Sequence, residues 1–306
     1  MTDAILVWNP NPTLDVVSEV SALAAGGVHR ADRQEVAPGG KGTLVLRTLA
    51  ALGVDSHGVA PLAGPTGNLV GELFERDSLP IETTEVDGQT RVAVSIVDGA
   101  TGTDTVVNGP GPKTGGPAWE AHLVMVERLL GSGRFRTFVV AGRPPLGGGD
   151  AGLARLCGSA GTQGLRVVLD LSSPLLEEGL RANPWLVKVN LEEARAVVGN
   201  GEPIEELCRR GAANVVLTDG PNAIQAKLGG DRLVIVPPSV RPRSAVGCGD
   251  CFLGALLWGL RDHPDDPAKC LRRAAEVASA AAETLQPASF SPRRAAELRA
   301  RGEQRG

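Results

Sequence analysis

The sequence predicts an α/β fold in which helices cover both faces of a mostly parallel β-sheet. Three observations predict it. Between residues 118 and 218, apolar strand-like runs alternate with amphipathic helical runs, and such alternation is typical of parallel sheets. A chain of 306 residues with a mean hydropathy near zero is long enough to bury a large core. Two strand-rich pieces, at about 10–37 and 88–110, interrupt the pattern and predict a small β lid inserted into one domain spanning 1–306.

Each element is predicted from its apolar period and its flanking residues. The strand predictions are Ala4–Trp8, Val16–Val20, Val28–Val36, Val54–Val59, Thr90–Val97, Thr105–Asn108, Thr137–Ala141, Arg166–Asp170, Leu186–Asn190, Asn214–Thr218, Ala223–Leu228 and Leu233–Val236. The helix predictions are Thr43–Ala51, Asn68–Arg76, Ala118–Leu130, Gly152–Ala160, Glu192–Val198, Ile204–Arg210, Asp250–Arg261, Pro267–Thr284 and Pro292–Arg301.

The composition excludes several classes of protein. The net charge is −4 and tyrosine is absent, so neither a basic face nor base stacking supports nucleic-acid binding. No apolar run approaches the ~20 residues of a membrane span. The first residues resemble a strand and not a signal peptide, which predicts a cytoplasmic protein. Five cysteines in a chain of this length do not make a disulfide framework. The Cys248-x-x-Cys251 pair is interpreted as small residues packed around a turn.

The most informative segment is Gly247-Cys248-Gly249-Asp250, which leads directly into an apolar helix. Glycines let the backbone approach a ligand closely, and the start of a helix favours an anion such as phosphate. An aspartate at this point is well placed to deprotonate an attacking hydroxyl. The alternative is a plain loop with an N-capping aspartate.

Polar residues follow several of the predicted strands. In open parallel sheets, ligands bind beyond the carboxyl ends of the strands. One crevice could therefore collect all of these segments, which are Asn11 to Asp15, Gly142-Arg143, Asp170, Asn190 and Thr218 to Gly220.

With these pieces in place, the chain resembles the ribokinase-like sugar kinases of the phosphofructokinase-B type, and most of all 1-phosphofructokinase and tagatose-6-phosphate kinase. The resemblance covers nearly the whole chain and rests on the order and spacing of short motifs. These are Asn11-Pro12-Thr13-Leu14-Asp15, Gly27-Val28-His29-Arg30, Pro38-Gly39-Gly40-Lys41-Gly42, Thr90-Arg91, Asn108-Gly109-Pro110-Gly111-Pro112, Lys188 to Glu193, Thr218-Asp219-Gly220 and Gly247 to Asp250.

The resemblance implies a three-layer α/β/α sandwich with a β lid, and ATP-dependent phosphorylation of a sugar hydroxyl. Asp250 would be the base, and the amides of Gly247, Cys248, Gly249 and Asp250 would form an anion hole. Asp15, Gly39, Gly40 and Lys41 would hold the sugar. A phosphate already on the sugar would meet Arg30, Arg91 and Arg143. Lys188, Asn190 and Glu193 would order the triphosphate and, indirectly, Mg²⁺, and Thr218 and Gly220 would contact the nucleotide.

Each of these assignments has an ordinary structural alternative: a strand-end cap for Asp15, a helix-start turn for Gly39 and Gly40, surface arginines, a first-turn charge for Glu193 and a tight turn at Thr218 to Gly220. The chain also departs from the family pattern. Leu44 replaces an asparagine that ordinarily holds sugar hydroxyls, Ala93 replaces another asparagine, Val189 replaces a proline, and Arg143 lies where a serine is usual.

The expected activity is therefore that of a kinase acting on a ketohexose monophosphate: fructose 1-phosphate, fructose 6-phosphate or tagatose 6-phosphate. Two alternatives stay open. One is a related kinase for an unphosphorylated sugar or a nucleoside, and the other is a non-catalytic regulatory protein that binds sugar or nucleotide. A dehydrogenase is disfavoured because no G-x-G-x-x-G follows the first strand. In related kinases the lid often forms a homodimer interface, and Val28 to Val36 could face either a partner or the substrate.

Overall fold

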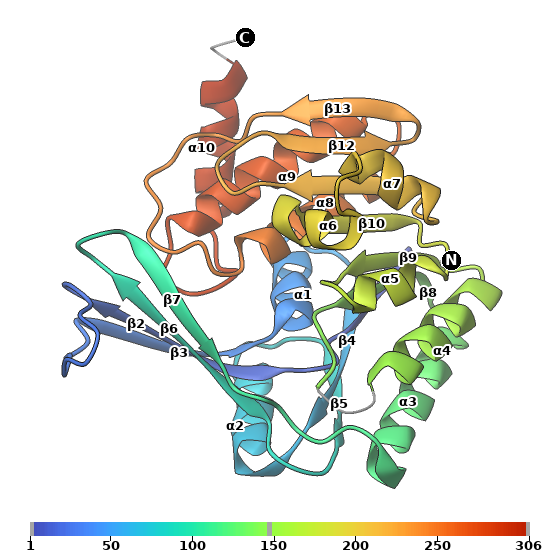
Figure 1. Ribbon diagram of the computed structural model, residues 1–306, viewed down its shortest axis with the longest axis horizontal. Helices are drawn as coiled ribbons and strands as arrows, with labels where there is room; N and C mark the ends of the chain where they lie inside the picture. The colour runs from blue at the N-terminus through green and yellow to red at the C-terminus, as the bar shows by residue number, and fades with distance from the viewer. Residues whose placement is uncertain (1–2, 146–148, 304–306) are drawn as a thin grey trace.

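A nine-stranded sheet forms the centre of the computed structural model, which describes residues 3–145 and 149–303 (Figure 1). Its strand order is β13-β12-β11-β10-β9-β8-β1-β4-β5. The strands from β5 to β11 in this order are parallel, whereas β12 and β13 pair antiparallel at one edge. The strands of this sheet are β1 (Ala4–Trp8), β4 (Ser56–Leu62), β5 (Ile81–Glu85), β8 (Phe135–Ala141), β9 (Arg166–Asp170), β10 (Leu186–Asn190), β11 (Asn214–Thr218), β12 (Ile224–Leu228) and β13 (Asp231–Ile235).

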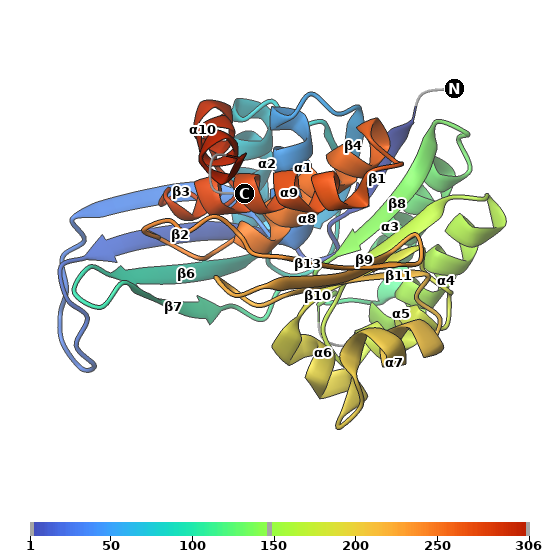
Figure 2. The same ribbon diagram turned by 90° about the horizontal axis from the view of Figure 1, so that it is seen from above.

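Helices cover both faces of this sheet, as the sequence predicts. Figure 2 shows α8, α9 and α10 on one side of the sheet and α5, α6 and α7 on the other. Along β1, Ile5 and Val7 enter one buried cluster, and Leu6 and Trp8 enter the opposite one, because successive side chains alternate across a strand. The helices are α1 (Lys41–Ala51), α2 (Gly64–Arg76), α3 (Gly116–Leu130), α4 (Gly149–Thr162), α5 (Leu175–Leu180), α6 (Leu191–Val198), α7 (Pro203–Arg209), α8 (Cys248–Asp262), α9 (Pro267–Ala282) and α10 (Pro292–Glu303).

A second, four-stranded sheet projects from one side of the large one (Figures 1 and 2). We call it the small sheet, and its order is β3-β2-β6-β7. Its strands are β2 (Thr13–Val20), β3 (Arg33–Gly39), β6 (Arg91–Asp98) and β7 (Thr103–Asn108). The two strand-rich pieces that the sequence separates therefore pair in space, through a parallel contact between β2 and β6.

The structure shifts two of the predicted strands and adds two elements that were not predicted. The strand expected at 28–36 is Arg33–Gly39, because its pairing with β2 continues to Gly39 opposite Thr13. The strand expected at 54–59 is Ser56–Leu62. The edge strand Ile81–Glu85 and the short helix Leu175–Leu180 were not predicted, since the first is polar and half-exposed and the second has only 6 residues.

The topology fixes where a ligand can bind. β1 lies between β8 and β4, so successive connections run to opposite sides of β1. The crevice at such a reversal, beyond the carboxyl ends of the strands, is the usual ligand site of open α/β sheets. Within the described residues, no helix combines the length and the apolar character needed to cross a bilayer.

Candidate active site

The turn before α8 has the geometry of an anion site. Gly247 is left-handed, with φ at +78°, and a Cβ there would lie 3.0 Å from the amide nitrogen of Ala288. The amides of Cys248 and Asp250 already donate to the carbonyls of Ala245 and Gly247. No described residue accepts a hydrogen bond from the amides of Gly247 and Gly249. Of the four amides that the sequence suggests for an anion, those of Gly247 and Gly249 are therefore the two without an acceptor among the described residues.

Asp250 lies in the first turn of α8 and is 6% exposed. Burial raises the pKa of its carboxyl to about 7, the charge of Asp170 adds to this rise, and Lys41 and Lys188 oppose it. A carboxyl that titrates near neutrality can both accept and release a proton under working conditions. The first turn of α8 therefore carries a buried carboxyl whose pKa would suit a general base.

Asp170 joins two lysines that come from separate motifs. It ends β9 and is fully buried, and it accepts hydrogen bonds from Lys41 Nζ at 2.8 Å and Lys188 Nζ at 3.0 Å. Burial alone would raise the pKa of Asp170, but the charges of Lys188 and Lys41 hold it below its usual value. The sequence predicts the position of Asp170 at this edge of the sheet. It predicts no role for Asp170, because no nearby motif indicates that Lys41 and Lys188 are its partners.

The two lysines bring positive charge close to the start of α8. A Cβ at Gly249 would lie 2.8 Å from Lys188 Nζ, so the absence of a side chain there leaves room for the ammonium group. Burial would lower the pKa of Lys41, but Asp170, Asp250 and Glu193 raise it above its ordinary value, which keeps it charged. This cluster, in which Asp170 and Lys188 are buried and Lys41 is partly exposed, lies beside a helix N-terminus and suits a polyanionic ligand.

Asn190 and Glu193 form a capping box at the start of α6. The Oδ1 atom of Asn190 accepts the amide of Glu193 at 2.7 Å, and Glu193 Oε2 accepts the amide of Asn190 at 3.1 Å. Glu193 therefore does have the structural role expected of a charge in the first turn of a helix. Its other oxygen, Oε1, lies 3.5 Å from Lys41 Nζ, so the same residue also faces the lysine cluster.

Asp15 lies on β2 against the end of β3, and its position requires a glycine there. A Cβ at Gly39 would lie 1.9 Å from Asp15 Oδ2, so any side chain at Gly39 would displace the carboxylate. Burial raises the pKa of Asp15 to about 6, against the lowering effect of Arg91 and Arg47. A carboxylate held in this way beside Gly40, whose φ is +89°, is suited to accept hydrogen bonds from sugar hydroxyls.

We expect Gly39→Ala to weaken sugar binding strongly. Because the added methyl group would overlap the Asp15 carboxylate, the KM for the sugar should rise about tenfold or more, as expected when a positioned group moves by 1 Å. Steady-state kinetics measures this change. Gly71→Ala is the matched control, since a Cβ there makes only an ordinary 3.5 Å contact with Leu62. A Gly39→Ala enzyme with an unchanged KM would contradict this arrangement.

The three candidate phosphate-binding arginines do not all converge. Arg91 lies beside the Asp15 site and donates to Asn11 O at 3.2 Å and to Asn108 Oδ1 at 3.1 Å. Arg143 is exposed and follows Gly142, where a Cβ would lie 3.4 Å from Lys41 Cβ. Arg30 is also exposed and lies beyond the far end of β2, so the structure does not bring it to Asp15 within one chain.

Thr218 and Gly220 lie where the sequence places them. Thr218 ends β11 directly opposite Asn190 in the parallel register. Gly220 follows with φ at +54°, so it also meets its alternative interpretation as a turn glycine. Both residues lie at the same sheet edge as the lysine cluster.

Leu44, the main departure from the family pattern, is buried at 4% exposure in the core between α1 and α8. Its Cδ1 atom would lie 3.1 Å from a Cβ at Gly247, so it packs behind the anion-site turn. Beside it, the buried Asn9 amide donates to Thr43 Oγ1 at 2.7 Å and to Gly39 O at 3.3 Å. Sequence reasoning missed this role of Asn9 in fixing Gly39.

Comparison with known proteins identifies the family and the fold. Residues 2–294 match the family model described as pfkB family carbohydrate kinase. The 1-phosphofructokinase of Rhodobacter capsulatus is 30% identical over 268 residues, covering 84% of each chain. The crystal structure of phosphofructokinase-2 from Escherichia coli in complex with fructose-6-phosphate superposes with a TM-score of 0.83 at 26% identity, over 98% of both chains. Ribokinase from Thermotoga maritima shares the fold, with a TM-score of 0.76 at 17% identity over 98% of this chain and 99% of that one.

Proposed function

Because the chain belongs to the pfkB family of carbohydrate kinases, we propose that it transfers the γ-phosphoryl group of ATP to a hydroxyl of a ketohexose monophosphate. Fructose 1-phosphate, fructose 6-phosphate and tagatose 6-phosphate are the candidate acceptors. The observation that carries the proposal is the buried Asp250, with a pKa of about 7, at the mouth of the Gly247 turn and beside two lysines. A cytoplasmic location, where both substrates occur, is part of the proposal.

In the proposed reaction, the sugar hydroxyl oxygen attacks the γ-phosphorus, the bond to the β,γ-bridging oxygen breaks, and ADP leaves. The hydroxyl proton passes to the Asp250 carboxylate. The amides of Gly247 and Gly249, with the positive end of the α8 dipole, face the transferring group. Lys41 and Lys188 offset the negative charge of the phosphates, and Asp170 holds both lysines in place.

ATP is the expected phosphoryl donor of this reaction, and Mg²⁺ is its expected metal cofactor. When bound, Mg²⁺ neutralises phosphate charge. Among the described residues, no three His, Cys, Asp or Glu side chains gather into a metal-binding group. Such a sparse donor set fits an ion that keeps most of its waters and binds chiefly to the triphosphate. Glu193, whose Oε1 lies outside the capping box, would hold it indirectly.

A phosphorylated sugar is favoured by the position of Arg91. Arg91 and Asp15 lie on the same face of the small sheet, because Thr13 pairs with Arg91 and Asp15 with Ala93. A sugar held by Asp15 would place its phosphate near this guanidinium, which suits phosphate through its planar donors. The relatives named for 1-phosphofructokinase activity, and the structure solved with fructose-6-phosphate, support the same substrate class. Arg143, which follows the glycine that lies against Lys41, is the second candidate for this phosphate.

We further propose that the small sheet is a lid, and that its outer face binds a second copy of this chain. Val16, Val36, Val94 and Val107 are cross-strand neighbours on that face, and Val107 is 62% exposed. Exposed apolar patches of this kind mark interaction sites. In such a dimer, Arg30 at the far end of the sheet would lie at the interface and not in its own site.

We expect Val107→Asp to dissociate this dimer, because an unpaired carboxylate is costly to bury between apolar side chains. Sedimentation velocity should show a dimer for the wild type and a monomer for the variant. Val124→Asp, at a 51% exposed valine on α3, is the matched control and should stay dimeric. A monomeric wild type, or a Val107→Asp variant that remains dimeric, would refute this interface.

The function is tested by ADP release with Mg-ATP across a panel of acceptors. The panel holds the three ketohexose monophosphates, free ketohexoses, ribose and a nucleoside. Turnover of a phosphosugar supports the proposal. Turnover only of an unphosphorylated acceptor would keep the kinase and overturn the substrate class. ATP binding with no turnover of any acceptor would favour a regulatory binding protein, with Leu44 as the first residue to examine.

A further inference from the structure

The small sheet touches the loop that leads into the anion site. Glu19, Val97 and Asp104 are paired across β2, β6 and β7, so they form one row, which we call the contact row, on one face of the sheet. Asp15 lies on this same face, because it is four residues before Glu19 on the same strand. The face that carries the candidate sugar carboxylate therefore also carries the contact row.

Both charged residues of the contact row bind the segment 243–245, which ends two residues before Gly247. Asp104 Oδ2 accepts the amide of Ala245 at 2.7 Å and the hydroxyl of Ser244 at 3.1 Å. The carboxylate of Glu19 pairs with Arg243 at 2.7 Å. Hydrogen bonds from a backbone amide to a carboxylate are among the stronger ones in proteins. This loop is thus fixed from the small sheet as well as from the end of α9, where the carbonyl of Ala282 accepts the amides of Arg243 and Ser244.

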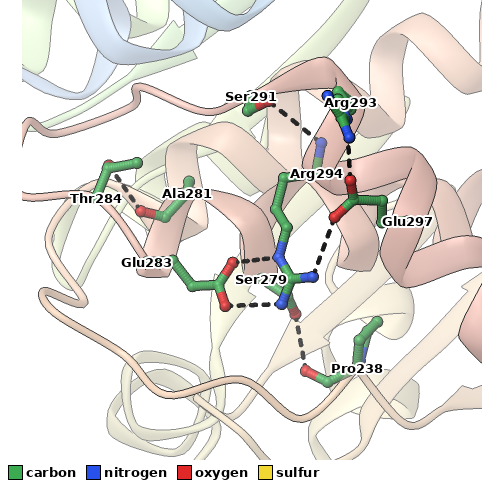
Figure 3. A network of polar contacts seen from close by, with 9 residues as sticks. All are labelled: Pro238, Ser279, Ala281, Glu283, Thr284, Ser291, Arg293, Arg294 and Glu297. Carbon is green, nitrogen blue, oxygen red and sulfur yellow. Dashed lines mark hydrogen bonds and ion pairs between the residues drawn. The ribbon is translucent and has the colours of Figure 1, made fainter.

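The apolar member of the contact row, Val97, packs together with Val17 of the same face against a second segment next to the Gly247 turn. Val17 and Val97 form a buried cluster with Leu285. The segment 284–291 that carries Leu285 also supplies Ala288, which crowds Gly247. Figure 3 shows how the ends of this segment are held, with Arg294 Nε and Nη2 donating to the two oxygens of Glu283 at 2.6 and 2.9 Å. The row therefore contacts both segments that shape the Gly247 turn.

We propose that Asp104 is a positioning residue that couples docking of the small sheet to assembly of the anion hole; this inference rests on the proposed kinase function. While the sheet is docked, Asp104 fixes the backbone at Ser244 and Ala245, and with it the direction of the Gly247 and Gly249 amides. When the sheet moves away, these bonds break and the turn loses its fixed position. The anion hole then forms fully only when the sugar site is closed, which protects ATP from hydrolysis by water.

Three variants separate this role from general stability. Asp104→Ala removes both acceptor bonds. Asp104→Asn keeps one carbonyl oxygen for them, and its amide nitrogen replaces Oδ1, which is buried without a partner. Asp32→Ala is the control, because Asp32 also accepts a serine hydroxyl, Ser21 Oγ at 2.9 Å, but within the tip of the small sheet. Ser244→Ala, which removes the hydroxyl bond to Asp104 together with the local bond that Ser244 Oγ accepts from the Val246 amide, serves if Asp104→Ala does not fold.

The first measurement is amide hydrogen exchange over residues 243–247 in the ligand-free protein. We expect faster exchange in Asp104→Ala and Ser244→Ala, near wild-type exchange in Asp104→Asn, and no change in Asp32→Ala. This readout needs no catalysis, so it tests the coupling even if the proposed function fails. Unchanged exchange in Asp104→Ala would overturn the inference.

The second measurement is kinetic. We expect Asp104→Ala to lower kcat about tenfold or more, with a KM for the sugar within about twofold of wild type, because the sugar contacts remain while the phosphoryl group is misplaced. The ratio of sugar-independent ATP hydrolysis to sugar phosphorylation should rise. Asp104→Asn should recover most of kcat. Equal kcat in Asp104→Ala and Asp32→Ala, or no recovery in Asp104→Asn, would contradict the role.

Discussion

Asp250→Asn should lower kcat about 10²–10⁴-fold, the usual loss when a general base is removed. The amide has nearly the same shape as the carboxylate, so the Kd for ATP should stay within about threefold of the wild type. Rapid-quench or coupled kinetics measures the first quantity, and calorimetric titration measures the second. A variant that keeps more than about a tenth of the wild-type kcat would show that Asp250 is not the base.

The same variant should also show a pH signature. Since burial raises the pKa of Asp250 from 3.8 to about 7, the folded protein holds a proton that the unfolded chain releases. The wild type therefore loses this stability as pH rises from about 4 to about 7, whereas Asp250→Asn does not. The Tm of the variant should exceed that of the wild type most clearly above pH 7, by about 2–4 °C for each kcal/mol regained. A difference in Tm that does not change with pH would contradict the assigned pKa.

Asp170→Asn should impair both stability and catalysis. It would leave Lys188, which is 5% exposed, and the Lys41 ammonium without their shared carboxylate. Breaking a buried ion pair by removing one partner costs about 3–5 kcal/mol of unfolding free energy. Urea denaturation measures this loss, and we expect kcat to fall as well, because both lysines lose their fixed positions next to the proposed phosphate site.

A double variant gives the control for this prediction. Asp170→Asn combined with Lys188→Met removes the uncompensated buried charge, so much of the lost stability should return while activity stays low. If Asp170→Asn alone is as stable as the wild type, the buried pair of Asp170 and Lys188, with the partly exposed Lys41, does not contribute as its geometry indicates.

Much of the architecture is predictable from the sequence because its signals are local. Strand and helix periods between Ala118 and Thr218 give the parallel sheet, and the glycine turn before Asp250 gives the start of α8. The polar segments after the strands meet at one edge because parallel strands end there. Ile81–Glu85 escaped prediction because an edge strand with half-exposed polar residues has no strong apolar period.

The unpredicted parts of the site depend on contacts distant in sequence. Asp170 bonds to Lys41 across 129 positions, and Asp104 bonds to Ser244 across 140. No short sequence motif predicts either of these contacts. From the sequence, Arg30, Arg91 and Arg143 are expected to bind the same sugar phosphate. In the structure, the length of β2 separates Arg30 from Asp15 within a chain. Leu44 replaces a sugar-binding residue in the motif, but in the fold it is a core residue behind Gly247.

The most direct test of the central claim is to follow the γ-phosphoryl group by phosphorus NMR, with Mg-ATP and each ketohexose monophosphate in turn. We predict that, with at least one of them, a second sugar phosphate ester appears in step with ADP, and that Asp250→Asn produces it at least a hundredfold more slowly. Inorganic phosphate in place of the ester, no reaction with any of the three sugars, or an equal rate in Asp250→Asn would contradict the account.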